Sequence, residues 1–202
     1  SEFGELVLCY DSRHYWRRDY FPEYKHSRKK GREKDTKNWD SIFSCLNKIK
    51  EEIKNNMPYK FLEVYGAEAD DIIAVLCAES SDEVMILSGD KDFIQLQKYP
   101  NVKQYSPITK KMINGFNPDD YLKEHVLKGD TSDGVPNVLS PDNSFVDGIR
   151  QKPLSKKKIA AMIDGNFPND EVKRNFQRNK TLIDLGCVPE ELRSEILHIY
   201  KE

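Results

Sequence analysis

The chain has 202 residues and a formal net charge of −2; 38% of its residues are hydrophobic and 33% are charged. This length allows one large domain, or a domain with a smaller satellite, around a buried core. No apolar run approaches the roughly 18–20 residues that a membrane span needs, and the first residues lack the basic and apolar regions of a signal peptide. The sequence therefore predicts no association with a membrane.

Strands and helices alternate in the first half of the chain. A buried strand is expected at 5–10, and a long helix at 38–56, where apolar residues recur every three or four positions. Residues 12–37 show no apolar period. The remaining elements of this half are a strand at 59–64, a helix at 68–78, a strand at 83–87, and short strands near 102–105 and 111–113.

The second half has a different character, with helices separated by polar loops. These helices are expected near 118–127, 155–163, 170–185 and 189–200. Because strands that alternate with helices form parallel sheets with right-handed crossovers, the predicted fold class is α/β. We expect an α/β body at 1–116 and a helical region at 117–202.

Acidic residues follow the predicted strands. The carboxyl ends of parallel strands form one edge of a sheet, where ligands bind, so these acids should meet there. Many carboxylates at close range need cations, and oxygen ligands suit Mg²⁺ or Mn²⁺. Two ions about 4 Å apart would activate a water and stabilise a leaving oxygen. The acids fall into four groups, the last in a glycine-flanked turn: Asp11; Glu68, Asp70 and Asp71; Asp90 and Asp92; Asp130 and Asp133.

The same acids have a simpler interpretation as helix caps. Asp70 and Asp71 fall in the first turn of a predicted helix, where negative charge favours the helix dipole. Asp90 or Asp92 could cap a short helix that follows the third strand. One such pair would favour capping, whereas four groups after successive strands favour a metal site.

Residues 12–37 form a basic segment with ten Lys or Arg against four Asp or Glu, a local charge of +6, which leaves −8 for the rest of the chain. Cations neutralise phosphates and aromatic faces stack on unpaired bases, so this segment predicts nucleic-acid binding. If 24–34 is helical, Lys25, Arg28, Lys29 and Arg32 share one face. The alternative is a solvated loop.

Five strings in order carry a family resemblance: VLCYDS at 7–12, YWRRDYFPEYKHSR at 15–28, EADDIIA at 68–74, SGDKDFIQL at 88–96 and LKGDTSDGVPNV at 127–138. The chain resembles the flap endonuclease/5′-nuclease superfamily, most closely its T-even-type phage RNase H branch. The resemblance implies a PIN-like core with a helical arch at 12–37 and a helix–turn–helix-type duplex-binding region.

The resemblance also implies residue roles. Asp11, Asp70 and Asp90 match ligands of a first Mg²⁺, and Asp92, Asp130 and Asp133 match the acids of a second. Glu68 matches an acid that helps to hold waters, and Asp71 matches no ligand. Lys25 and Arg28 match arch cations that contact the scissile phosphate. The other expected nucleic-acid contacts are Arg17, Arg18, Lys29, Arg32, Lys156, Lys157 and Lys158.

Two departures from the family pattern stand out. Family members begin with a strand that bears an early Asp ligand, and nothing before Asp11 supplies it. The resemblance therefore implies a truncated chain that lacks one strand and one acid and is weakly active or inactive. The glycine-rich hairpin after the last acidic motif is not intact either, since Gly134 leads into a longer loop. Lys156–158 are then expected to bind the duplex beside that loop.

The function implied is a 5′→3′ exonuclease and flap endonuclease that removes primers during phage DNA replication. Its substrates would be DNA flaps and RNA:DNA hybrids. It would act as a monomer in the cytoplasm of the infected cell, with a single-strand-binding protein and a clamp as candidate partners. Two alternatives stay open: a nucleic-acid-binding module without catalysis, and a PIN-like ribonuclease.

Overall fold

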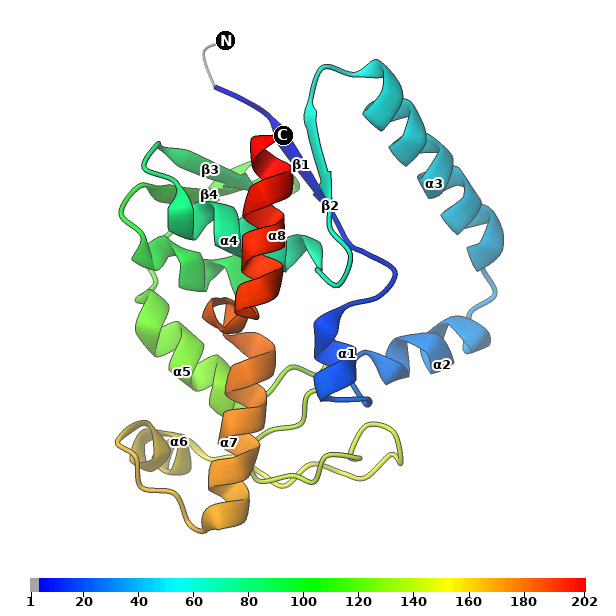
Figure 1. Ribbon diagram of the computed structural model, residues 1–202. Coiled ribbons are helices and arrows are strands. Elements are labelled where there is room, and N and C mark those ends of the chain that lie inside the picture. The colour runs from blue at the N-terminus through cyan, green and yellow to red at the C-terminus, as the bar shows by residue number, and fades with distance from the viewer. Residues whose placement is uncertain (1–3) are drawn as a thin grey trace.

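The computed structural model describes residues 4–202, apart from the side chains of Lys29, Lys30 and Lys34 (Figure 1). Within that range, none of the helices is both long and apolar enough to cross a bilayer. The strands are β1 (Val7–Tyr10), β2 (Lys60–Glu63), β3 (Val84–Leu87), β4 (Val102–Ser106) and β5 (Lys111–Ile113). The helices are α1 (Trp16–Tyr20), α2 (His26–Lys34), α3 (Trp39–Asn56), α4 (Ala69–Glu79), η1 (Lys91–Lys98), α5 (Pro118–Lys128), α6 (Lys156–Ile163), α7 (Asp170–Ile183), η2 (Leu185–Cys187) and α8 (Glu190–Lys201).

The predicted strands and helices are present, with ends that shift by one or two residues. β1 pairs with β2 in parallel, and β3 pairs with β4 in parallel. β5 adds an antiparallel edge to β4. The described strands form two hydrogen-bonded groups, β1-β2 and β3-β4-β5, instead of one continuous sheet. The α/β fold class with parallel strands is confirmed.

The core lies around α4, whose sequence is apolar on several sides because both of its faces are covered. On one face, Ile72 and Val75 pack with Leu62 of β2 and with Ile196 of α8. On the other face, α4 meets the second group of strands through Ala74, Cys77 and Ile86. Figure 1 shows α8, the last helix of the chain, lying beside α4. The C-terminal helix therefore completes the core of the α/β body.

The long helix α3 projects from the body and is joined to it through α1 and α2 (Figure 1). Its apolar periodicity predicted the helix correctly, yet no residue of α3 is fully buried. Leu46 is 54% exposed, and Phe43 and Ile49 are nearly as exposed. An ion pair of 2.7 Å between Lys50 and Glu63 ties α3 to β2. The periodicity therefore identified the helix without showing what covers its apolar face.

The long loop between α5 and α6 is held by polar side chains of α7. Asn179 Nδ2 donates to the carbonyl oxygen of Pro136 in this loop at 2.8 Å and to that of Val126, in the last turn of α5, at 2.9 Å. Asn175 Nδ2 donates to the carbonyl of Val138 at 3.0 Å. Because backbone carbonyls inside a protein need partners and this loop has no strand ladder, these amides replace one. α7 thereby fixes the loop that starts with the turn at 129–134, which carries Asp130 and Asp133 and is called the acidic turn below.

Candidate active site

The acids predicted to meet at one edge are placed there by the ends of the strands. Asp11 follows β1, and its Oδ1 accepts a 2.7 Å hydrogen bond from the backbone N–H of Ala69, at the start of α4. Asp70 lies in the first turn of α4, and Asp90 follows β3 as the N-cap of η1. β1 and β3 belong to separate hydrogen-bonded groups of strands, and α4, which packs against both groups, brings the carboxyl ends of these strands together.

Asp70 lies in the field of the neighbouring acids. Burial and the nearby charge of Asp90 raise the pKa of Asp70 to about 7, against the lowering effect of Lys25. Asp11 adds a smaller contribution in the same direction as Asp90. These three acids therefore share one electrostatic environment, although among residues 4–202 they do not form a set whose ligand atoms all lie within 4.8 Å.

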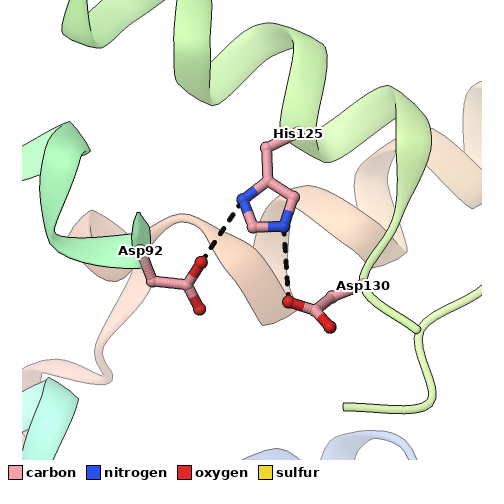
Figure 2. Close-up of side chains that lie close together, drawn as sticks. All are labelled: Asp92, His125 and Asp130. Atoms are coloured by element: carbon pink, nitrogen blue, oxygen red, sulfur yellow. Dashed lines mark ion pairs between the residues drawn. The ribbon is translucent and has the colours of Figure 1, made fainter. Parts of the chain in front are cut away.

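The tightest candidate metal set in the described part of the chain is Asp92, His125 and Asp130, whose ligand atoms lie within 4.8 Å of one another. Figure 2 shows the imidazole of His125 between the two carboxylates. His125 Nδ1 lies 3.5 Å from Asp92 Oδ1, and Nε2 lies 3.4 Å from Asp130 Oδ2. The residues come from η1, from the last turn of α5 and from the turn after it.

The donor set fits a divalent cation. Burial raises the pKa of Asp92 to about 6, although His125 acts in the opposite direction. Burial would lower the pKa of His125, but the interactions with Asp130 and Asp92 raise it overall. Buried carboxylates at close range repel one another unless positive charge lies between them. The imidazole supplies that charge when protonated, and a cation could supply more.

The turn between Gly129 and Gly134 presents Asp130 and Asp133 to the site. Asp130 Oδ1 accepts 2.7 Å hydrogen bonds from both the backbone N–H and the hydroxyl of Ser132. Burial opposes ionisation, but the nearby imidazole of His125 and the hydrogen bonds from Ser132 hold the pKa of Asp130 well below its usual value. A small pocket is lined by residues from both halves of the chain, among them Tyr24, Asp70, Asp92, Asp130 and Asp133.

The basic segment enters the acid cluster. The ammonium of Lys25 pairs with Glu68 and lies 3.6 Å from Asp133. Burial would lower the pKa of Lys25, but Asp133 and Glu68 raise it. Arg28 pairs with Asp133, and Tyr24 donates its hydroxyl to Asp133 at 2.7 Å. The two cations expected to face a phosphate thus lie against acids of the site.

The helix expected within the basic segment is partly present. α2 is helical from His26, so the conditional helix at 24–34 is present over most of its length. Arg28 and Arg32 are exposed, whereas the side chain of Lys29 lies outside the described residues. Lys156, Lys157 and Lys158 are exposed in the first turn of α6. Figure 1 shows α6 at the end of the molecule opposite the strands.

The expectation that Arg17 contacts nucleic acid needs correction. Its side chain is 2% exposed, because its guanidinium pairs with Glu68 at 2.9 Å and with Asp71 at 2.7 Å. Its Nε donates to the carbonyl of Leu182 at 2.8 Å. Arg17 therefore joins α1, α4 and α7 from inside the protein and is not available to a phosphate. Arg18 next to it is exposed and lies over the ring of Tyr15.

Capping explains part of the acidic pattern. Asp71 Oδ2 accepts the backbone N–H of Glu68 at 3.0 Å, as expected for a capping residue. Asp90 Oδ1 accepts the N–H of Asp92 at 3.0 Å. One oxygen of Asp90 is used in this way, which leaves the other available to a cation. Capping and metal binding are thus compatible at Asp90.

His125 is the main functional candidate that the sequence reasoning missed. A single histidine in a helix carries no pattern, and its partners lie 33 and 5 residues away in sequence. The available signal was its place one turn before the acidic turn, on the same helix as the buried Val126 and Leu127. Tyr24, one of the aromatic residues of the basic segment, also belongs to the site, because its hydroxyl links Glu68 with Asp133.

Comparison with known proteins places this geometry among nucleases. The sequence profile described as "5′-3′ exonuclease, N-terminal resolvase-like domain" matches residues 2–126. The chain is 36% identical to the ribonuclease H of Enterobacteria phage T4, over 98% of this chain and 70% of that protein. It is 28% identical to the flap endonuclease Xni of Shewanella sp. (strain MR-4), over 61% of this chain and 48% of that protein. The chain thus spans about half to 70% of these relatives.

The fold is similar to solved structures as well. The T5 D15 protein co-crystallised with metal ions matches with a TM-score of 0.68 and 19% identity, over 97% of this chain and 86% of that chain. A T5 D15 flap endonuclease variant, in a pseudo-enzyme-product complex with DNA and metal ions, matches with the same TM-score over 98% of this chain and 85% of that chain. At this identity the likeness establishes the shared fold.

Proposed function

This chain belongs to the 5′-3′ exonuclease family, a family of structure-specific 5′ nucleases, and on that premise we propose that it hydrolyses phosphodiesters in 5′ DNA flaps and RNA:DNA hybrids with Mg²⁺. The observation that carries the proposal is the cluster of acids at the strand ends. Two of them, Asp70 and Asp92, have pKa values raised to about 7 and about 6. Perturbed carboxylates that converge from distant parts of a chain are typical of catalytic sites.

The chemistry that two divalent cations supply when bound is the activation of a water and the stabilisation of the leaving oxygen. Under this proposal Asp11, Asp70 and Asp90 hold one cation, and Asp92, Asp130 and Asp133 hold the other. Mn²⁺ would also suit these oxygen donors. Glu68 is 2% exposed and paired with Lys25 and Arg17, so its proposed role is to orient those cations beside the site.

Lys25 and Arg28 are the residues we propose to meet the scissile phosphate. Both contact Asp133 across the site, so both lie within a side-chain length of the acids. A phosphate that enters would compete for these cations and take over part of the pairing that Glu68 and Asp133 now supply. Arg18 and Arg32, which are exposed on the same segment, would follow the single strand beyond that phosphate.

Lys156, Lys157 and Lys158 are proposed to bind the duplex part of the substrate. They stand in the first turn of α6, where backbone N–H groups and the helix dipole also favour a phosphate. Figure 1 shows α6 at the end of the molecule opposite the strands, which suits a substrate whose duplex extends away from the cleaved strand. Primer removal in phage DNA replication, in the infected cell, is the proposed setting, because phage T4 ribonuclease H matches 98% of the chain.

The test uses labelled substrates and one binding measurement. The chain should release short 5′ products from a 5′-flap DNA and from an RNA:DNA hybrid in Mg²⁺, and none in EDTA. It should prefer the flap to bare single-stranded RNA. Binding of the flap in EDTA without any release in Mg²⁺ would favour a binding module without catalysis, and a preference for bare RNA would favour a PIN-like ribonuclease.

A further inference from the structure

We propose that His125 is a direct nitrogen ligand of the cation site that it forms with Asp92 and Asp130, and that it makes this site favour a first-row transition ion over Mg²⁺. The inference deepens the proposed function, on which it rests for the assignment of the acids as cation ligands. It adds a residue, and with it a metal preference, that an all-carboxylate site would not have.

The geometry points to coordination in preference to simple hydrogen bonding. The contacts of 3.5 Å to Asp92 and 3.4 Å to Asp130 exceed the roughly 2.7–3.2 Å of a good N–H···O hydrogen bond. Ligands held about 2.0–2.2 Å from one ion, at right or tetrahedral angles, lie roughly 3.0–3.5 Å apart. The 3.5 Å separation between Nδ1 and Asp92 therefore matches two neighbouring ligands of one cation, while Nε2, on the opposite side of the ring, is left to face Asp130.

One ring nitrogen lacks a partner. Nδ1 of His125 is shielded from solvent and has no hydrogen-bond partner among the described residues. A buried polar atom without a partner destabilises the folded protein. Nδ1 points at the carboxylate of Asp92 from 3.5 Å away, and a cation bound between the two groups would give this nitrogen its missing partner. Figure 2 shows that the same nitrogen faces Asp92 while the opposite nitrogen faces Asp130.

The imidazole is also held in place before any ion binds. His125 lies in the last turn of α5, and its carbonyl accepts the N–H of Gly129 at 2.9 Å. The ring of Tyr121, one turn earlier on the same helix, packs edge-on against it with ring centroids 5.8 Å apart. Val126 and Leu127 anchor this turn in the core. A ligand that is ordered in advance loses little entropy on binding.

The expected ligand class follows from the donor atoms. Mg²⁺ takes oxygen ligands and keeps several waters, whereas imidazole nitrogen favours transition ions. One imidazole with two carboxylates is therefore expected to bind Co²⁺ more tightly than Mg²⁺. Because a ligand histidine must lose its proton to bind a cation, binding is best measured in mildly alkaline buffer, at about pH 8.

The test measures cation binding to the whole chain without nucleic acid. Calorimetric titration at about pH 8 should show that His125→Gln weakens Co²⁺ binding about tenfold or more, with Mg²⁺ binding changed less than about twofold. His198→Gln, at an exposed histidine of α8, is the matched control and should change neither affinity. Equal weakening for both ions would mean that His125 only positions the acids, and no weakening would remove it from the site; either result overturns the proposal.

A second readout needs no variant. Electron spin echo spectra of Mn²⁺ bound to the unmodified protein should show ¹⁴N modulation, which becomes ¹⁵N modulation after labelling of histidine. Spectra with no nitrogen modulation would overturn the proposal even if His125→Gln failed to fold. Nitrogen coordination in a chain that never cleaves a flap would reject the proposed function and keep His125 as a ligand. Cleavage without nitrogen coordination would keep the proposed function and reject His125 as a ligand.

Discussion

The ammonium of Lys25 is paired with the carboxylate of Glu68, a residue 43 positions further along the chain and 2% exposed. This pair joins the basic segment to the start of α4. Glu68 also pairs with Arg17, so two cations from the same segment balance one buried carboxylate. The basic segment is therefore part of the acid site and not merely a solvated loop beside it.

Replacement of Lys25 should cost stability as well as activity. Loss of one partner from a buried ion pair costs roughly 3–5 kcal/mol, and the lower end applies to Lys25→Met because Arg17 still pairs with Glu68. Urea unfolding measures this cost. Lys37→Met is the control, since Lys37 pairs with Asp35 at the surface, and it should change the unfolding free energy by less than about 0.5 kcal/mol. Equal costs for the two variants would show that the pair of Lys25 and Glu68 stabilises the fold no more than a surface ion pair does.

The neighbours Arg17 and Arg18 should behave in opposite ways. Arg17→Met leaves Asp71 and Glu68 buried with fewer partners and should lower the unfolding free energy by about 3–5 kcal/mol. Arg18→Met should leave stability within about 0.5 kcal/mol and weaken the binding of single-stranded DNA at low salt. A stable Arg17→Met protein with weakened DNA binding would restore Arg17 as a phosphate contact.

Stability without cations should fall as the pH rises. The pKa of Asp70 is raised from 3.8 to about 7, so between these values the folded protein holds a proton that the unfolded chain has released. The unfolding free energy must then decrease with rising pH across this window. In EDTA, the unmodified protein should lose on the order of 2 kcal/mol more than Asp70→Asn between pH 5 and pH 8.

Divalent cations should reverse that loss, because they bind the ionised form of the acids. Mg²⁺ should therefore stabilise the protein more at pH 8 than at pH 5, and the gain should shrink in Asp70→Asn. Parallel pH profiles for the two proteins in EDTA would show that Asp70 does not hold a raised pKa.

The acidic turn depends on Gly129. Its φ is +70°, and a Cβ at this position would come within 2.3 Å of the carbonyl oxygen of Val135. Gly148 has a similar φ of +68° with open space around it, so Gly148→Ala carries only the backbone cost of about 1–2 kcal/mol. Gly129→Ala should cost clearly more in thermal or urea unfolding and should also weaken cation binding at Asp130. Equal costs would mean that the turn relaxes without loss.

Much of the fold could be predicted because local patterns report it directly. The apolar spacing of α3 and the short apolar runs of β1 and β3 identify these elements, and the rule that ligands bind beyond the carboxyl ends of parallel strands predicts that Asp11, Asp70 and Asp90 gather. Contacts between side chains that are far apart in the sequence could not be predicted in this way. A basic segment without periodicity does not show that Arg17 turns inward.

The buried polar residues of α7 illustrate the same limit. Asn175 and Asn179 look like ordinary surface residues of a helix, and only the folded chain shows that they satisfy the carbonyls of a loop some 40 residues earlier. His125 likewise can be recognised as a candidate ligand only through its contacts with Asp92 on η1 and Asp130 on the turn after α5. Local periodicity predicts elements, whereas these contacts depend on how the elements pack.

The central claim, that the acids at the strand ends carry out metal-dependent cleavage, is tested most directly at the two ends of β3. Asp90 follows its carboxyl end, and Glu83 precedes its amino end as an exposed acid paired with Lys103. In Mg²⁺, Asp90→Ala should abolish release of 5′ products from a 5′-flap DNA, while Glu83→Ala should cleave like the unmodified chain. Retained cleavage by Asp90→Ala at saturating Mg²⁺ would contradict the account.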